Sequence, residues 1–238
     1  MEKVKVLCIV QARLTSTRLP NKVFKLLQGK SIIELLYERL CMAKTIDKIV
    51  FAIPDNQENA SLCDYLKERG IETFLGSELD VFDRFLQCGK KYKPDWVVRV
   101  TCDNPLMDWT IIDKLVLRAQ DTNADYCSMT GYPVGIVARV FNFHTFEAID
   151  KASLTDSEIE HVTPVFYNHP EQYNVNIENV EFDKFRLSVD TAEDFELMTK
   201  IYDELYEGTP IPNDKVYAYL RKHPELCEIN KDIKQVKA

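Results

Sequence analysis

The sequence lacks an excess of basic residues. Its 238 residues include 30 Lys and Arg against 38 Asp and Glu, which gives a formal net charge of −8 at pH 7. Because nucleic-acid phosphates are held by clustered basic surface, this balance argues against a protein that binds nucleic acid through bulk charge. With 45% hydrophobic and 29% charged residues, the chain has the composition of a folded domain. Its length favours one large core over two small ones, so we expect a single domain over 1–238.

Long apolar runs and paired cysteines are also missing. No stretch approaches the roughly 18–20 uninterrupted apolar residues of a membrane span, and Gln11 and Arg13 soon interrupt the first apolar segment. The seven cysteines are odd in number, widely spaced and never arranged as C-x-x-C. We therefore expect a protein that is neither secreted nor membrane-anchored and that works in the reducing cytoplasm.

Apolar runs of strand length alternate with helical patterns in the first half of the chain. Continuous apolar runs of this kind are typical of buried parallel strands. The alternation predicts an α/β fold with a mixed, mostly parallel sheet and helices on both faces, and ligands bind such sheets at the carboxyl ends of the strands. Strands are expected at 4–10, 48–53 and 96–101, and helices after a capping box of Ser31 and Glu34, around 62–66 up to Gly70, over 81–92, and over 111–122 after the cap Thr110.

The pattern changes beyond residue 125. Short strands are expected there with helices between them, so residues 125–185 are interpreted as an elaboration on the side of the sheet that would receive an acceptor. A helix follows the cap formed by Thr191 and Asp194, and the segment 229–238 is expected to be a frayed tail. The short strands are predicted at 125–128, 136–141, 173–177 and 186–189.

The loop after the first strand carries three cations and no acid. Arg13, Arg18 and Lys22 lie within residues 11–22 among Ser and Thr hydroxyls. The first glycine of the chain is Gly29, so this loop is neither a Walker loop nor a G-x-G-x-x-G motif, and side chains must meet the charge of a ligand. Guanidinium and hydroxyl groups at this place favour capture of a polyphosphate. The alternative is a solvated basic loop.

Two acids follow predicted strands. Asp103 comes after the strand 96–101, and Pro105 stiffens the loop that carries it; Asp190 ends the strand 186–189. Both would lie at the ligand-binding edge of the sheet, where they could meet. One or two carboxylates, completed by water and phosphate oxygens, suit Mg²⁺. The alternatives are that Asp103 forms a turn and that Asp190 stabilises a helix dipole.

Five motifs occur in a fixed order and together resemble a known family. The motifs are V-Q-A-R-x-x-S-T-R-L-P-x-K at 10–22, D-V-F-D-R-F at 80–85, V-V-R-V-T-C-D-N-P-L at 97–106, E-H-V-T-P at 160–164 and L-S-V-D-T-A-E-D-F-E at 187–196. With these motifs, the sequence resembles the cytidylyltransferases, most closely their spore-coat polysaccharide biosynthesis branch, which is related to the enzymes that make CMP-linked acidic sugars. The resemblance covers about residues 4–206.

This resemblance implies a GT-A-like Rossmann-type fold and a nucleotidyltransferase. The enzyme would transfer CMP from CTP to a small-molecule acceptor, expected to be an acidic sugar, with Mg²⁺ as cofactor and release of pyrophosphate. Relatives are often dimers, so a homodimer is possible. The family pattern assigns Arg13, Arg18 and Lys22 to the triphosphate, Asp103 and Asp190 to the metal ion, and Gln11, Ala12, Asp80 and Arg84 to the base. For Arg84 the alternative is a solvated helix face.

Departures from the family fall where the acceptor is expected. Val134 and Arg139 stand where relatives carry acids, and Ile159 replaces a basic residue. An added arginine favours an acceptor that is more anionic than that of relatives, so Arg139 is an acceptor-binding candidate. The family motif makes His161 a second one. The alternatives are that Arg139 is a surface strand residue and that His161 is a satisfied helix histidine.

Three alternative functions are compared with this prediction. The same chemistry could act on a phosphate or phosphonate acceptor, which Arg139 would suit. The altered acceptor region also allows a catalytically silent nucleotide-binding module. A GT-A glycosyltransferase shares the fold but binds its metal through D-x-D, and this chain has no D-x-D.

Overall fold

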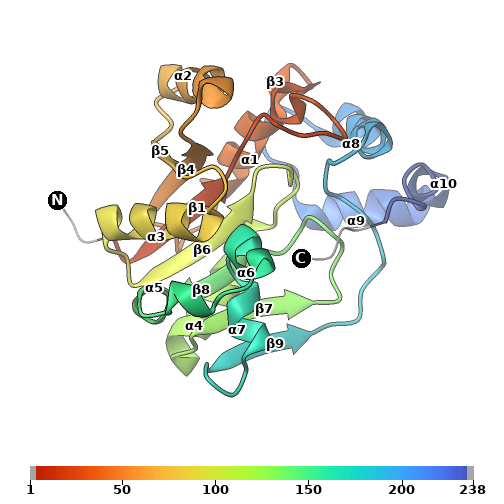
Figure 1. Cartoon of the computed structure of the whole chain (residues 1–238). Helices are drawn as coiled ribbons and strands as arrows, with labels where there is room; N and C mark the ends of the chain where they lie inside the picture. Colours follow the sequence, from red (N-terminus) through yellow and green to blue (C-terminus); the bar gives the residue numbers. More distant parts are fainter. Residues whose placement is uncertain (1–3, 235–238) are drawn as a thin grey trace.

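A seven-stranded sheet crosses the centre of the protein (Figure 1). The structure is a computed structural model that describes residues 4–234. The strand order is β5-β4-β1-β6-β8-β7-β9, and a separate two-stranded ribbon joins β2 to β3. The bounds are β1 (Val6–Gln11), β2 (Leu26–Leu27), β3 (Lys30–Ser31), β4 (Lys48–Pro54), β5 (Thr73–Gly76), β6 (Trp96–Thr101), β7 (Tyr126–Thr130), β8 (Arg139–Asn142) and β9 (Val175–Asn179).

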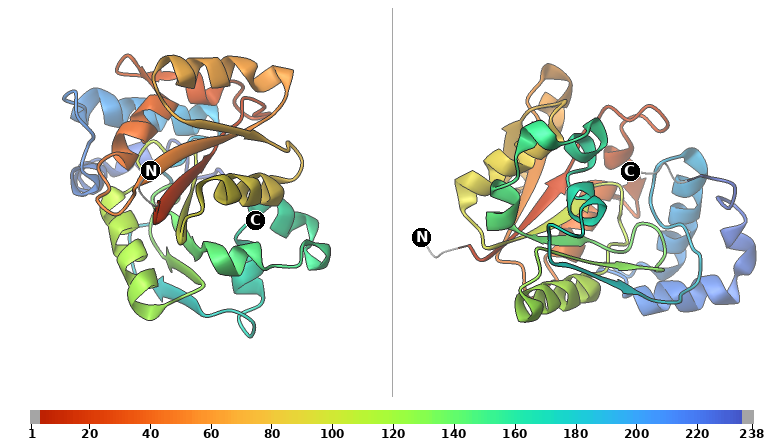
Figure 2. Two further views of the ribbon diagram at one scale, coloured as in Figure 1. Left: turned by 90° about the vertical axis from the view of Figure 1, so that its left-hand side faces the viewer. Right: turned by 60° about the horizontal axis from the view of Figure 1, so that its bottom comes forward.

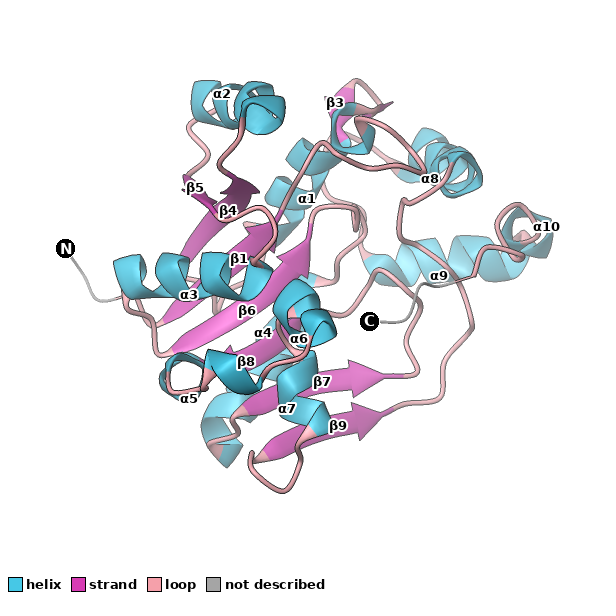
Figure 3. Cartoon of the chain, in the orientation of Figure 1, coloured by secondary structure: helices cyan, strands magenta, loops and turns pink. Residues whose placement is uncertain are grey.

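The sheet is mixed and mostly parallel, as the sequence predicts. β1 runs parallel to β4 and β6, β5 runs parallel to β4, and β9 runs parallel to β7. Only β8 is antiparallel to its neighbours, β6 and β7. Because β1 and β6 are parallel, the loops that follow them emerge at the same edge of the sheet (Figure 3).

Helices cover both faces of the sheet (Figure 2). Alternate residues of β1 enter two different cores: Cys8 and Val10 pack on one face, whereas Leu7 and Ile9 pack on the other. The first core holds α1, α2, α4, α8 and α9, and the second holds α3, α5 and α7. The helices are α1 (Ile32–Leu40), α2 (Ala60–Glu68), α3 (Val81–Tyr92), α4 (Trp109–Thr122), α5 (Phe143–Glu147), α6 (Asp156–His161), α7 (Pro164–Asn168), α8 (Ala192–Leu205), α9 (Asn213–Lys222) and α10 (Pro224–Cys227).

Local capping explains where most helices begin. The capping boxes predicted at α1 and α8 are both present, with Ser31 bonded to the backbone of Glu34 and Thr191 to that of Asp194. The start of α4 differs from the prediction, because its cap is Asp108. The Asp108 carboxylate accepts hydrogen bonds from the backbone N–H groups of residues 110 and 111, so Thr110 lies inside the helix.

The expected strand at 186–189 is wrong. Its backbone hydrogen bonds go to two loops: the N–H of Leu187 donates to the carbonyl of Val134 at 2.8 Å, and the N–H of Val189 donates to that of Asp103 at 2.8 Å. Only an isolated bridge joins Arg186 to Val134. The segment is therefore a buried connector that ties the loop after β6 to the start of α8.

Two other expected strands are shifted, and the tail is corrected in part. The strand expected at 136–141 begins only at Arg139, because the carbonyl of Ile136 accepts from the N–H of Asp108 at 3.1 Å instead of joining a ladder. The strand expected at 173–177 is β9. The expected fraying from 229 is wrong at Asn230, which is 3% exposed and hydrogen-bonded to the body; 235–238 of that segment lie outside the described residues.

No helix within residues 4–234 is long and apolar enough to cross a membrane.

Candidate active site

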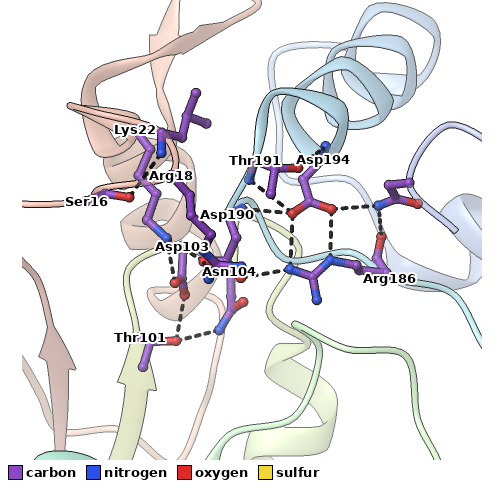
Figure 4. Close-up of polar contacts among 12 residues, drawn as sticks. Ser16, Arg18, Lys22, Thr101, Asp103, Asn104, Arg186, Asp190, Thr191 and Asp194 are labelled. Carbon is purple, nitrogen blue, oxygen red and sulfur yellow. Dashed lines mark hydrogen bonds and ion pairs between the residues drawn. The ribbon is translucent and has the colours of Figure 1, made fainter. Parts of the chain in front are cut away.

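Two carboxylates meet one ammonium group at the carboxyl edge of β1 and β6 (Figure 4). The Nζ atom of Lys22, in the loop after β1, lies 2.8 Å from Oδ2 of Asp103 and 2.8 Å from Oδ1 of Asp190. Arg18 approaches the same Asp190 oxygen, with its Nη2 atom at 3.2 Å. The predicted convergence of the two acids beside the cationic loop is confirmed by these distances.

The loop after β6 holds Asp103 in place. The hydroxyl of Thr101 donates to Oδ1 of Asp103 at 2.7 Å, and the side chain of Asn104 donates to that hydroxyl at 2.8 Å. The other carboxylate oxygen is left to Lys22. Since the backbone carbonyl of Asp103 accepts from Val189, the segment before Asp190 is fixed next to Asp103.

Asp190 is held from behind by a buried arginine. The Nη2 atom of Arg186 donates to Oδ2 of Asp190 at 2.8 Å, while its Nε atom donates to Asp194 at 2.9 Å. Asp194 is 1% exposed and also accepts from the backbone N–H of Asp190 at 3.0 Å. The side chain of Asn230 donates to Asp194 at 2.8 Å and to the carbonyl of Arg186 at 3.0 Å. One oxygen of Asp190 is therefore fixed to the body, and the other faces the loop.

The charges at this edge stabilise one another. Burial opposes the charge of Lys22, but the carboxylates of Asp103 and Asp190 outweigh it and raise the pKa of Lys22. Burial likewise opposes ionisation of Asp190, yet Lys22, Arg18 and Arg186 together lower the pKa of that carboxyl. Asp190 is thus ionised and Lys22 is protonated at neutral pH. Lys22 is only 8% exposed, so the alternative that it belongs to a solvated basic loop is wrong. Arg13 and Arg18, in contrast, are exposed.

The backbone of the cationic loop bends through Asn21. Asn21 adopts the left-handed conformation, with φ of 54°, directly before the short 3-10 turn Lys22–Phe24. Asn tolerates this conformation better than most residues with a side chain. The bend turns Lys22 inward.

Arg84 and Arg13 form a second pair of neighbouring cations. Arg84 is 1% exposed on α3 and donates to the carbonyl of Ser77 at 2.7 Å, so the alternative of a solvated helix face is wrong. Its Nε atom is buried with no hydrogen-bond partner in the described chain. Burial first, and then the charge of Arg13, lower the pKa of Arg84 to about 10. The sequence motif named Arg84 but could not show its burial.

The other base-binding candidates have local structural partners. The Gln11 side chain accepts from the Nη2 atom of Arg99 at 2.9 Å. Ala12 is buried, and its N–H donates to the carbonyl of Ala52 at 3.2 Å. Asp80 caps α3 by accepting from the N–H of residue 83, and it also pairs with Lys151. The base-binding role of these residues stays a prediction.

His161 ends α6 beside a strained turn. The next residue, Val162, has φ of 67° and ψ of −54°, and the N–H of Thr163 donates to the carbonyl of His161 at 2.7 Å. This γ-turn geometry is costly for a β-branched residue, and such strain clusters at functional sites. The ring of His161 makes no hydrogen bond within the described residues, against the alternative of a satisfied histidine. Burial, followed by the charges of Arg99 and Arg13, lowers its pKa, which Glu160 opposes.

The donor set at Lys22 suits a hard cation. Two oxygens from different carboxylates already converge on a single positive charge. Within residues 4–234 there is no cluster of three or more His, Cys, Asp and Glu residues that could hold a metal. Mg²⁺ needs only one or two carboxylates when phosphates and water complete its shell, so Asp103 and Asp190 fit it.

Comparison with known proteins places the chain in a family. The model of the family described as Cytidylyltransferase matches residues 7–235. An uncharacterised protein of Methanocaldococcus jannaschii is 36% identical over 98% of this chain and 97% of its own length. Spore coat polysaccharide biosynthesis protein SpsF of Bacillus subtilis is 31% identical over 93% of this chain and 96% of its own. A solved cytidylyltransferase structure from Leptospira borgpetersenii has 25% identity and a TM-score of 0.87, covering 98% of this chain and 100% of that one.

The fold and the match together define a nucleotidyltransferase, an enzyme that transfers a nucleoside monophosphate from its triphosphate. The chain belongs to the cytidylyltransferase family, whose nucleotide is CTP. The resemblance in the sequence motifs and the predicted fold class are confirmed. The sequence reasoning missed Arg99 and Asn230. Arg99 stands inside a quoted motif, but only the sheet register shows which residue faces it.

Proposed function

We propose that this protein transfers CMP from CTP to an anionic small-molecule acceptor, an acidic sugar in the first instance, and releases pyrophosphate. The product would be an activated precursor for a surface polysaccharide or glycoconjugate, in keeping with the name of the Bacillus subtilis relative. The seven cysteines are free, which suits a reaction in the reducing cytoplasm.

One observation carries the proposal: the carboxylates of Asp103 and Asp190 converge within 2.8 Å of one cationic nitrogen, beside Arg18. Transfer of a nucleotidyl group asks for little covalent chemistry from a protein. Positioning of the reactants and stabilisation of charge supply most of the acceleration. A site with two carboxylates for a cation and neighbouring cations for phosphates provides both.

The loop after β1 would receive the triphosphate. Arg13 and Arg18 are exposed and could reach phosphate oxygens, and Lys22 could exchange its carboxylate partners for a phosphate. These three side chains would neutralise the negative charge that builds on the departing pyrophosphate. Gln11, Ala12 and the N-terminal end of α3 would border the base.

The oxygen of an acceptor hydroxyl attacks the α-phosphorus in line and loses its proton to solvent, while the bond to pyrophosphate breaks on the opposite side. Asp103 and Asp190 would hold Mg²⁺, which when bound neutralises the α-phosphate and lowers the pKa of a coordinated oxygen. Thr101 and Arg186 keep Asp103 and Asp190, respectively, in fixed positions through the reaction. No side chain in the described residues stands out as a dedicated general base.

Pyrophosphate release tests the proposal. The wild-type protein is incubated with Mg²⁺ and each of the four nucleoside triphosphates, against a panel of acidic sugars, sugar phosphates and phosphonates. We expect release with CTP and an anionic acceptor together, and a CMP-linked product by mass spectrometry. A protein that binds CTP but releases nothing with any acceptor would be the silent nucleotide-binding module, and the proposal would fail.

A phosphate or phosphonate acceptor is the second candidate. The observation in its favour is Arg139, which adds positive charge on β8, next to β6 in the sheet. The same acceptor panel separates this candidate from an acidic sugar, because only one of the two groups of compounds would give a CMP-linked product.

A further inference from the structure

Two arginines face each other across the sheet. In the antiparallel pair of β6 and β8, Arg99 lies directly opposite Arg139. Each is two residues from a strand residue of the second core, Val97 or Phe141, so both arginines lie on that face of the sheet. Like charges directly opposite one another destabilise a sheet, so this pairing has a cost that the fold alone does not explain.

Within residues 4–234, no acid forms an ion pair with either arginine. Arg99 donates from Nη2 to Gln11 at 2.9 Å, and Arg139 donates from Nη1 to the carbonyl of Val137 at 3.1 Å. Within residues 4–234 no carboxylate lies within 4.0 Å of either guanidinium, and the Nε atom of Arg99 is buried with no partner. Both side chains are half-buried, where a cation is usually paired with an acid. Burial first, and then Arg139, lower the pKa of Arg99 to about 10.

The pair lies beside the two acids, with Arg99 bonded to Gln11 at the end of β1 and Arg139 one strand farther from the nucleotide loop. β6 runs from Arg99 to Thr101, whose hydroxyl holds Asp103. The nucleotide loop follows β1, on the opposite side of β6 from β8 (Figure 1). The charge of Arg99 also contributes to the lowered pKa of His161, at the end of α6. A molecule bound between Arg99 and Arg139 would approach the metal-binding edge from the β8 side of β6, whereas the nucleotide loop lies on the β1 side.

We propose that Arg99 and Arg139 form the subsite that binds the anionic group of the acceptor, a carboxylate or a phosphate. This inference rests on the proposed function and names the residues that select its acceptor. An anion between the two guanidinium groups would receive forked hydrogen bonds and cancel the repulsion across the sheet. Neutral sugars would gain nothing from the pair.

The test uses a variant that separates a structural role from a binding role. Arg139→Glu places an acid opposite Arg99 and so creates an ion pair inside the sheet. The proposal expects this variant to unfold at a higher temperature than the wild type without added anion, yet to lose anion binding. Arg139→Gln removes the charge without adding the acid. Lys67→Glu, on the exposed surface of α2, makes the same change of charge elsewhere and serves as the control.

Binding is measured by titration calorimetry on the full chain, with Mg²⁺ and the nucleotide site first filled by α,β-methylene-CTP. Sodium phosphate and sodium acetate are the probes, and sodium chloride at matched ionic strength is the reference. We expect at least tenfold weaker binding of the effective probe to Arg139→Glu and Arg139→Gln, and no change in Lys67→Glu. Phosphate alone, acetate alone or both can be effective, and this identifies the anion.

Equal binding by the wild type and both Arg139 variants would overturn the proposal, as would a wild type that binds neither probe better than chloride. The nucleotide titration is read separately. If the CTP analogue fails to bind, the proposed function fails, and the same probes titrated without nucleotide still test the arginine pair.

Discussion

The two oxygens of Asp190 have different tasks. Oδ2 is tied to the buried Arg186, and Oδ1 faces Lys22 and Arg18 across the loop. The carboxylate can therefore exchange the partner of one oxygen without losing its orientation. Asp103 is arranged in the same way, with Thr101 on one oxygen and Lys22 on the other. At the scale of single residues, the site consists of two fixed acids, each with one oxygen held only by the cationic loop.

Loss of one of these charges should affect turnover more than nucleotide binding. Asp190→Asn keeps the shape of the side chain but removes the charge that would hold the metal ion. We expect kcat to fall by about 100-fold to 1000-fold, the range seen when one preorganised stabilising group is removed. The dissociation constant for CTP should change less than threefold. Asp64→Asn, on the exposed face of α2, is the control; normal turnover in both Asp103→Asn and Asp190→Asn with Mg²⁺ would rule out the metal assignment.

Arg18 should behave in the opposite way. Its side chain is 43% exposed and reaches Asp190 from the loop, so it is free to follow the phosphates. A charge-assisted hydrogen bond is worth roughly 1.5–3 kcal/mol, so Arg18→Ala should raise KM for CTP by about tenfold or more. Steady-state kinetics with Arg18→Lys beside it would show partial rescue. An unchanged KM in Arg18→Ala would remove Arg18 from the nucleotide site.

Glu34 links stability to pH outside the site. Burial opposes its charge, but hydrogen bonds from Arg69, Ser31 and Tyr65 lower the pKa of Glu34 to about 2. A carboxyl whose pKa is lower in the folded state stabilises the fold above its unfolded value of about 4.3, and that contribution is lost as pH falls toward 2.

Urea denaturation should show this dependence. Glu34→Gln is expected to lower the free energy of unfolding most at pH 7 and progressively less between pH 5 and pH 3. The control Glu68→Gln, whose side chain is 76% exposed, should change it little at any pH. A deficit in Glu34→Gln that is the same at pH 7 and pH 3 would contradict the assignment.

At the scale of elements, the start of α8 ties the end of the chain to the active site. Asp194 completes the capping box of α8 and also accepts hydrogen bonds from the side chains of Arg186 and Asn230. The capping box was readable from the Thr191 and Asp194 spacing. The rest was not, because Asn230 follows two further helices and no local pattern shows that it returns to the first turn of α8.

Asn230→Ala should therefore weaken both stability and catalysis. Removal of its side chain leaves an oxygen of the buried Asp194 short of a donor, and we expect a loss of about 1–3 kcal/mol in the free energy of unfolding. Because Asp194 also steadies Arg186 and Asp190, kcat should fall while KM for CTP changes little. Lys231→Ala, next to it on the exposed surface, should be close to wild type. Equal stability of the two variants would show that this segment is not anchored.

Sequence periodicity predicted the elements that carry their own signals. α3 was placed at its observed bounds, and the strands β1, β4 and β6 were placed to within two residues, because each is a continuous apolar run or a regular amphipathic pattern. The segment 186–189 has the composition of a strand but hydrogen-bonds to two loops. Tertiary context decides such short segments, and composition cannot.

At the scale of the whole molecule, the strand order explains why the site is where it is. The chain moves outward from β1 through β4 to β5 and then returns to place β6 on the other side of β1. Ligands bind at such a reversal point, outside the carboxyl ends of the strands. The loop with Lys22 and the loop with Asp103 flank this point. This rule made it possible to predict from the sequence that the two loops lie close together. It could not predict that Arg99 lies opposite Arg139, because that depends on the register of an antiparallel strand, which short sequence patterns do not determine.

The most direct test of the account is a crystal structure of the protein with α,β-methylene-CTP and Mn²⁺, read by anomalous diffraction. The account predicts an anomalous peak with oxygens of both Asp103 and Asp190 among its ligands, and Lys22 moved from between the two acids to a phosphate. A bound nucleotide with Lys22 still bridging Asp103 and Asp190, and no metal ion in contact with either carboxylate, would contradict it.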